Sequence, residues 1–255
     1  KIAVISVFLG VFVSLSAISI GKGLQIAIKD KLYSLSPDLV ISTYENNSRG
    51  IASEKINNFE SINNEIKNTL KGIEIEKTIE KPTLISVDNS FETVIFRGVN
   101  NGYNFRDFNK FIIGSKIKND ITNNEIIISK SLSDNLKILV GQNLTLYFQV
   151  NNNQRIPNVR SFKVSHIYET DFPDFDNNYI IGNLETLQNV YKWSKNDFGN
   201  IEISVEDKLQ ISLIEKSISL LKYFEKNNLS IKTVQSKYAN IFSWISIFDF
   251  NILII

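Results

Sequence analysis

The sequence predicts an α+β fold, in which a membrane-spanning helix leads into a domain of mixed helices and strands and a second span begins at the end. Three observations predict it. An uncharged run from Ile2 to Ile20 has the length of a membrane span. Helical and strand patterns then alternate over roughly 200 residues, enough for one or two compact domains. A second apolar run occupies Ile241 to Ile255 and has Asp249 as its only charge.

The first predicted element is one long helix. Ile2 to Ile20 would extend over roughly 28 Å as a helix, close to the hydrocarbon thickness of a bilayer. Beyond it, apolar residues continue at helical spacing, at Leu24, Ile28, Leu32 and Leu35. Pro37 cannot continue a helix, and the residue before a proline avoids the helical conformation. We therefore expect the helix to leave the membrane as an amphipathic stalk that stops before Pro37.

Two other interpretations of this segment compete. Lys1, an apolar core and small residues from Ser14 to Ser19 also resemble a cleaved signal peptide. A buried helix of a soluble protein would be apolar as well. The apolar residues beyond Ile20 continue the helical spacing, which favours the membrane span. A cleaved segment need not share a helix with the residues after it.

The chain beyond Pro37 has the patterns of mixed elements. Short alternating or continuous apolar runs predict strands at 38–43, 73–79, 83–87, 91–99, 125–129, 144–150, 162–168, 179–181, 201–205 and 231–234. Helical spacing predicts helices at 53–70, with Ser53 as N-cap, and at 129–136, 183–193 and 209–224.

The order of these elements predicts an insertion. Residues 37–83 and 183–238 form a discontinuous, membrane-proximal α+β subdomain, and residues 84–182 form a β-rich subdomain inserted into it. Residues 1–36 are the first span and its stalk, and residues 239–255 begin the second span. The chain starts without Met and ends inside an apolar run, so we expect a fragment of a longer membrane protein.

Composition argues against several functions. A net charge of +1 with no basic tract leaves no electrostatic footprint for nucleic acid. His166 is the only histidine and there is no cysteine, so disulfides and strong zinc-site spacing are excluded. No G-x-S-x-G elbow or phosphate-binding glycine loop is present. The acidic stretch from Glu169 to Asn178 does not match calcium-loop spacing and favours a solvated turn. We expect no cofactor and no catalytic activity on this chain.

The spans carry the remaining signals. Ser6, Gly10 and Ser14 recur every four residues, a spacing that lets membrane helices pack closely. Trp244 stands near the start of the second run, where aromatic rings favour the membrane interface. Asp249 is either a functional residue inside the span or an interfacial one.

An ordered set of segments resembles one family. It consists of "GKGLQIAIKDKLYSLSPDLVIS", "FRGV", "NEIIISKSLSDNLKILVGQNLTLYF", "FKVSHIYETDFPDFDNNYIIGNLETLQ" and "IFSWISIFDFNILII". Together they resemble the lipoprotein-releasing ABC-transporter permeases of the Lol C/E type, which are FtsX-like permeases with a MacB-like periplasmic core domain. The resemblance covers nearly the whole chain.

The resemblance implies a multi-pass protein of the bacterial inner membrane with a large periplasmic domain. It also implies a cytoplasmic ABC ATPase, a second permease subunit, a lipoprotein substrate and a periplasmic lipoprotein carrier as partners. The lysines just after the first span would by themselves favour a cytoplasmic domain, although large domains translocate despite such charges. By position, the loop 149–160 corresponds to a carrier-binding hook, with four residues as its contacts: Gln154, Arg155, Pro157 and Arg160.

Three functions stay open at this point. The first is extraction of lipoproteins from the inner membrane, with ATP hydrolysed by a partner subunit. The second is a mechanotransmission permease of the same superfamily, serving drug or toxin export or the control of cell-wall hydrolases. The third, of another class, is a membrane-anchored sensor or binding module that couples to no ATPase.

Overall fold

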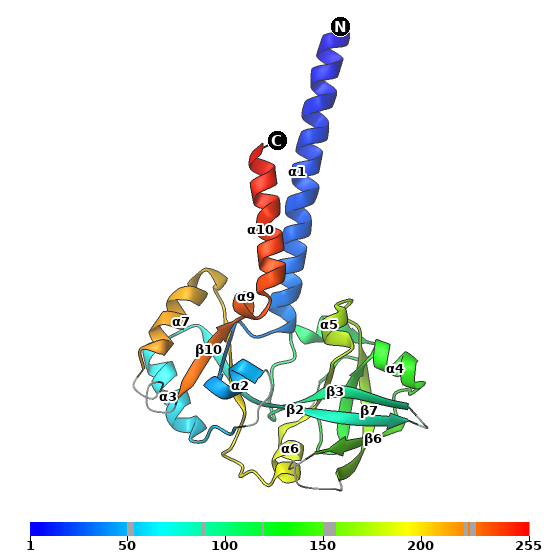
Figure 1. Cartoon of the computed structure of the whole chain (residues 1–255), viewed down its shortest axis with the longest axis vertical. Coiled ribbons are helices and arrows are strands. Elements are labelled where there is room, and N and C mark those ends of the chain that lie inside the picture. The colour runs from blue at the N-terminus through cyan, green and yellow to red at the C-terminus, as the bar shows by residue number, and fades with distance from the viewer. Residues whose placement is uncertain are drawn as a thin grey trace.

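The computed structural model describes residues 1–49, 54–87, 90–118, 120–149, 157–221, 224 and 228–254 of the 255-residue chain. Its first element is a single helix, α1 (Ile2–Leu35), which rises from the domain and extends beyond it (Figure 1). Ser36 is extended (φ −134°, ψ 144°), as the residue before a proline prefers. The predicted span and stalk are therefore one continuous helix.

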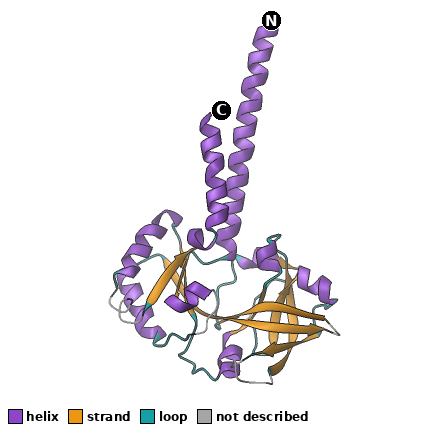
Figure 2. Cartoon of the chain, in the orientation of Figure 1, coloured by secondary structure: helices purple, strands orange, loops and turns teal. Residues whose placement is uncertain are grey.

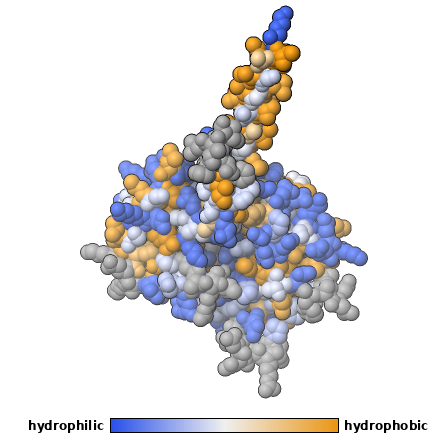
Figure 3. Space-filling view, turned by 45° about the horizontal axis from the view of Figure 1, so that its top comes forward, coloured by the Kyte–Doolittle hydropathy of each residue, from blue (hydrophilic) through white to orange (hydrophobic). Residues whose placement is uncertain are grey.

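The outer part of α1 has the properties of a membrane span. Its most apolar stretch has a mean hydropathy of 2.4 and no buried residue, and it is the only helix in the described part of the chain that is long and apolar enough to cross a bilayer. Figure 3 shows hydrophobic side chains covering this part of the helix, whereas the domain surface has mixed polarity.

One ten-stranded sheet organises the domain, in the order β10-β1-β9-β2-β3-β8-β5-β7-β4, with β6 paired to β2 and β7 (Figure 2). We call β10, β1 and β9 the first strand group. Its strands are β1 (Leu39–Thr43), β9 (Asn200–Val205) and β10 (Leu229–Thr233). The second strand group consists of β3 (Ser90–Val99), β4 (Ile112–Ile113), β5 (Glu125–Ser129), β6 (Asn143–Phe148), β7 (Asn158–Tyr168) and β8 (Tyr179–Asn183).

The strand β2 (Ile73–Val87) connects the two groups. Its residues 73–78 pair with β9, and its residues 84–86 pair with β6. Pro82 lies in the interval between these two pairings, where that edge of β2 needs no ladder hydrogen bond. The prediction of two separate strands here was wrong, because Pro82 is accommodated inside one strand.

Helices cover both groups. The remaining helical elements are α2 (Tyr44–Arg49), α3 (Phe59–Thr69), η1 (Phe108–Phe111), α4 (Lys130–Leu136), α5 (Pro173–Asp176), α6 (Leu184–Tyr191), η2 (Lys208–Gln210), α7 (Ile211–Ser219), α9 (Val234–Lys237) and α10 (Ala239–Ile254). The main apolar core runs under both strand groups, from Leu39 and Ile203 to Phe96 and Phe162. The α+β class is confirmed.

The predicted helix at 53–70 begins later than expected. Ile56 instead forms a β-bridge with Phe198, and Asn58 is left-handed (φ 62°), so α3 starts at Phe59. Ser53, its predicted N-cap, lies outside the described residues. The bridge shows that tertiary pairing overrides the local helical pattern.

The division into two subdomains stays a prediction. The sheet continues through β2 across the predicted boundary at residues 83 and 84. The prediction places α6 in the membrane-proximal part, but this helix packs on β3 of the second strand group, where Leu184 and Leu187 approach Gly98.

At the other end of the chain, α10 lies beside α1 (Figures 1 and 2). Its 16 residues extend over about 24 Å, less than a full span. A second span therefore stays a prediction.

Candidate functional site: the foot of the helix pair

The helix pair α1 and α10 is joined by a few specific contacts just above the domain. The buried Gln25 side chain donates from Nε2 to the carbonyl oxygen of Ile245, at 3.2 Å. Lower down, the rings of Tyr33 and Phe242 meet edge to face at 6.3 Å. The Tyr33 hydroxyl accepts from Gln235 at 2.9 Å. These contacts make the two helices a paired stalk, and we call its lower end, residues 33–38 and 233–242, the joint.

Asp38 attaches the joint to the first strand group. Its side chain is 1% exposed, and Oδ2 accepts from the Val205 amide at 2.7 Å and from Lys208 Nζ at 2.6 Å. Its carbonyl oxygen accepts from the Val234 amide at 3.0 Å. A buried carboxylate needs such donors, because an unpaired one would be costly to desolvate. One residue thus connects the end of α1 to β9, η2 and α9.

The segment between β7 and β8 holds the joint from the other side. Phe172 packs edge to face on Tyr238 at 5.8 Å, and the Tyr238 hydroxyl lies 3.0 Å from Ser36 Oγ. Lys31 and Asp171 form an ion pair at 3.5 Å, but Asp171 is 82% exposed, so this pair contributes little. The aromatic contact is therefore the stronger of the two.

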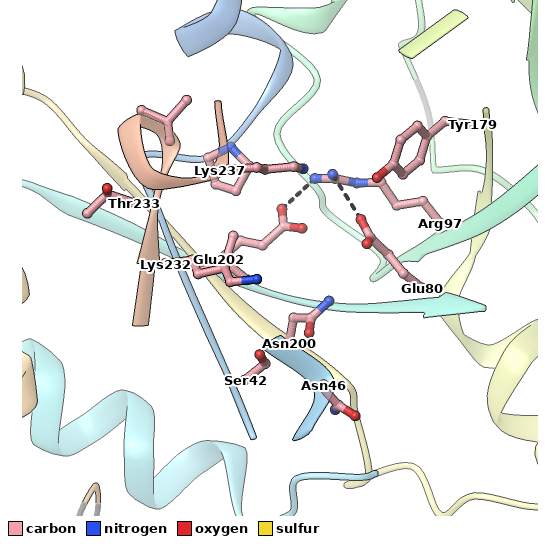
Figure 4. A pocket seen from close by; sticks show the side chains of 13 residues that line it. Ser42, Asn46, Glu80, Arg97, Tyr179, Asn200, Glu202, Lys232, Thr233 and Lys237 are labelled. Carbon is pink, nitrogen blue, oxygen red and sulfur yellow. Dashed lines mark hydrogen bonds and ion pairs between the residues drawn. The ribbon is translucent and has the colours of Figure 1, made fainter. Parts of the chain in front are cut away.

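A buried charge network lies in the sheet beneath the joint (Figure 4). Arg97 of β3 is 5% exposed and donates from Nη2 to Glu202 Oε2 of β9 at 2.6 Å. Its Nη1 reaches Glu80 of β2 at 3.4 Å. The Tyr103 hydroxyl accepts from Arg97 and donates to Glu202, at 3.1 and 3.3 Å. The network connects both strand groups across β2.

The network shifts the titration of its members. Burial is the largest single influence and would lower the pKa of Arg97, but Glu202, Tyr103 and Glu80 together raise it well above its usual value. Burial and the Glu202 carboxylate raise the pKa of Tyr103. Arg97 therefore stays charged and Tyr103 stays neutral at physiological pH, which makes the network a fixed bridge rather than a proton-transfer site.

Sequence reasoning did not single out this network. The alternation in 73–79 predicts a half-buried strand with a solvated polar face, yet Thr78 and Glu202 on that face are buried. The register places Glu80 opposite Arg97 and Glu76 opposite Glu202. A lone arginine among apolar residues, in "IFRGV", was the available signal.

The predicted span residues lie apart from this site. Ser6 and Gly10 are exposed on α1, Ser14 is half-buried, and a Cβ at Gly10 would meet nothing within 4 Å. Trp244 is 48% exposed on α10. Asp249 lies in α10, and its side chain is outside the described part of the chain. Their roles in helix packing or a lipid path stay predictions.

The predicted hook loop connects two paired strands, β6 and β7. Gln154 and Arg155 lie outside the described residues, whereas Pro157 and Arg160 are exposed. Tyr191 of α6 donates to the carbonyl oxygen of Gln149 at 3.4 Å, which places the start of the loop near α6, far from the helix pair (Figure 1).

This architecture, an apolar helix leading into one α+β sheet, agrees with a family model. The model of the MacB-like periplasmic core domain matches residues 2–221. The chain belongs to this family. Among curated proteins, no sequence matches it.

Two solved structures share the fold. The periplasmic region of MacB from Actinobacillus actinomycetemcomitans has a TM-score of 0.53 and 16% identity, over 80% of this chain and 91% of that one. The extracellular domain of the noncanonic ABC-type transporter YknZ from Gram-positive bacteria has a TM-score of 0.50 and 16% identity, over 76% of this chain and 99% of that one. At such identities the likeness concerns the fold alone.

Membership of the MacB-like family has three consequences. The chain is part of an ABC-type transporter permease, its domain lies on the periplasmic or extracellular side, and the family implies a cytoplasmic ATPase partner.

Proposed function

We propose that this MacB-like chain is a mechanotransmission permease, in which ATP hydrolysis by a partner subunit moves the extracytoplasmic domain through the helix pair. The observation that supports this most is the joint, where Asp38 connects α1 to the first strand group and Tyr238 contacts Phe172 between β7 and β8 of the second. A continuous helix is stiff over its length, so a displacement at the membrane would reach both groups. In the proposed assembly the full-length protein is multi-pass and works with a second permease subunit.

Extraction of lipoproteins from the inner membrane is the second candidate. The hairpin of β6 and β7 supports it, because the start of its loop lies at the end of the domain far from the helix pair, where a periplasmic carrier could reach it. The ordered segments that resemble the Lol C/E type support it as well. In this proposal the helix pair moves a lipoprotein out of the bilayer. The loop 149–160 then binds the carrier, to which the lipoprotein is transferred.

One experiment separates these functions. The full-length protein would be isolated from native membranes in mild detergent, and its partners identified by mass spectrometry. An ABC ATPase without acylated proteins is the result expected for mechanotransmission. An ATPase together with acylated lipoproteins would shift the assignment to lipoprotein release. Recovery of no ATPase would contradict both and leave a membrane-anchored sensor or binding module.

A further inference from the structure

The level at which the bilayer surface crosses the helix pair can be read from exposed apolar side chains. On α1 they continue past the uncharged run to Leu24 and Ile26, and on α10 they begin at Trp244. The hydrogen bond from Gln25 to the carbonyl oxygen of Ile245 places these side chains at one height on the two neighbouring helices (Figure 1). Exposed apolar residues and a tryptophan at the same level are typical of the membrane interface. The bilayer surface therefore meets α1 near Gln25.

Two lysines lie on one face of α1 at this level. Lys22 and Lys29 are seven residues apart, which is about two helical turns, so they project from the same side of the helix about 10 Å apart along its axis. Lys22 is exposed and Lys29 is half-buried. The Cα–Cβ bonds of a helix tilt toward its N-terminus, which here is the membrane side. The Lys29 side chain therefore starts out toward the bilayer surface.

These two lysines keep their charge unbalanced in the described part of the chain. Lys31, on another face of α1, forms an ion pair with Asp171, whereas no described carboxylate is paired with Lys22 or Lys29. Asp30 is the acidic residue of this part of α1, and it lies about 100° around the helix from Lys29. The face of Lys22 and Lys29 is therefore positive.

The same face is also apolar between its charges. Ile26 follows Lys22 by four residues and precedes Lys29 by three, so it lies between them on the helix surface, and it is 58% exposed. A soluble anion would contact the lysines and leave Ile26 in water. A phospholipid supplies a phosphate for the ammonium groups and hydrocarbon for the isoleucine. The combination therefore fits an amphiphile better than a small anion.

The side of the membrane adds a further argument. Lysines that flank a span are enriched on the cytoplasmic side. The domains of the MacB-like family lie on the opposite side, so Lys22 and Lys29 stand where this bias disfavours them. An attraction to anionic headgroups of that leaflet would offset the bias.

We propose that this face of α1 binds an anionic phospholipid of the extracytoplasmic leaflet. The lipid phosphate would lie between the ammonium groups of Lys22 and Lys29 and accept hydrogen bonds from both, and an acyl chain would cover Ile26. The bound lipid would hold the helix pair at a fixed depth in the bilayer. This inference depends on α1 as a membrane span and not on the proposed transport function.

The test uses the full-length protein in a neutral detergent. Its thermal unfolding midpoint would be measured as phosphatidylglycerol or phosphatidylcholine with the same acyl chains is added to the micelles. A ligand of the folded state raises the midpoint, so a rise that saturates is expected for phosphatidylglycerol and not for phosphatidylcholine. The double variant Lys22→Gln/Lys29→Gln should need about tenfold more phosphatidylglycerol for half of the rise, because its charge-assisted contacts are lost.

The matched control is Lys67→Gln/Lys71→Gln, which removes two exposed lysines of the domain and should respond as the wild type does. Lys22→Arg/Lys29→Arg keeps both charges and should retain the response to phosphatidylglycerol.

Three results would overturn the proposal. The first is an equal rise with both lipids, and the second is a double glutamine variant that responds as the control does. The third is a rise with glycerol phosphate, which carries the anion without acyl chains, as large as that with the lipid. None of them depends on whether an ATPase is recovered, so failure here is distinct from failure of the proposed function.

Discussion

At the scale of single residues, Arg97 is the contact on which both strand groups converge. It is buried, and its two carboxylate partners come from β2 and β9. Such a pair costs desolvation when it forms, and removing one partner leaves a buried charge uncompensated. The network therefore specifies which strands lie together more than it adds to stability.

Glu202→Gln should lower the free energy of unfolding by about 3–5 kcal/mol, because Arg97 loses its closest counter-charge at 2.6 Å. Near-ultraviolet circular dichroism of the full-length protein in detergent, during denaturant titration, measures this. Glu169→Gln is the control: it breaks an exposed pair with Lys130 at 3.3 Å and should cost less than about 1 kcal/mol. Equal effects of the two variants would contradict the bridging role of the network.

Lys81 is a second informative residue. It is 6% exposed in β2, and its Nζ lies 4.7 Å from the ring centroids of both Tyr191 and Trp193. Burial lowers the pKa of Lys81 to about 8. The rings stabilise the cation partly, and no carboxylate is paired with it in the described part of the chain.

The contribution of Lys81 to the stability of the domain should consequently rise with pH between about 8 and 10.4. In this window the unfolded chain binds more protons at Lys81 than the folded one, since the unfolded lysine has its ordinary pKa of about 10.4. The stabilisation from neutral, buried Lys81 is complete above the pKa of about 10.4 that this lysine has in the unfolded chain. It is lost as the pH falls to the pKa of about 8 in the folded chain. Denaturant titrations at several pH values should show a smaller slope for Lys81→Met than for wild type. Parallel pH profiles of the two proteins would disprove this, and the exposed Lys71→Met serves as control.

At the scale of elements, two glycines set the spacing between β3, β8 and α6. Gly98 and Gly182 are opposite each other in the parallel pairing of β3 and β8. A Cβ on Gly98 would lie 2.9 Å from the Leu184 Cα, and one on Gly182 would lie 2.3 Å from Phe96 Cζ. The absence of side chains therefore allows α6 to start directly over β3.

Gly98→Ala should destabilise the domain by about 1–3 kcal/mol, because backbone atoms of α6 must shift to admit the methyl group. Gly23→Ala on α1 is the matched control, since a Cβ there meets nothing within 4 Å and alanine favours a helix. Thermal unfolding of both variants in detergent provides the comparison. A Gly98→Ala protein as stable as Gly23→Ala would show that α6 adjusts freely.

At the scale of the whole molecule, one sheet carries both strand groups and one joint holds the helix pair to both. The chain has no cysteine, so two introduced cysteines can be spin-labelled without background. Leu213 on α7 and Val159 on β7 are 67% and 50% exposed and lie in different parts of the domain. Their separation reports movement of one part relative to the other.

If the joint transmits movement, the distance distribution between labels at Leu213→Cys and Val159→Cys should change when the partner ATPase is trapped with ATP and vanadate. Pulsed electron spin resonance on the reconstituted complex, diluted with unlabelled protein, measures it. Phe172→Ala should reduce the change, because the ring contact with Tyr238 is lost. Leu139→Ala, exposed at 64%, is the control and should leave it intact. An unchanged distribution in the trapped state would argue against mechanotransmission.

The sequence by itself determined the class of the fold, the long first helix and most of the strands. These depend on local physics: apolar length for the span, alternation for the strands, and Pro37 for the end of α1. The same local patterns misplaced the start of α3, where the partner of Ile56 is Phe198, far along the chain.

Only the tertiary structure shows which residues come together in the candidate site. Glu80, Arg97 and Glu202 lie on three different strands, and strand pairing with no local signature brings them to one face of the sheet. The alternating pattern marks that face as polar, but whether a polar face meets water or a covering helix depends on how the chain packs. In the folded chain Arg97 and Glu202 are buried, and their burial makes these side chains one network.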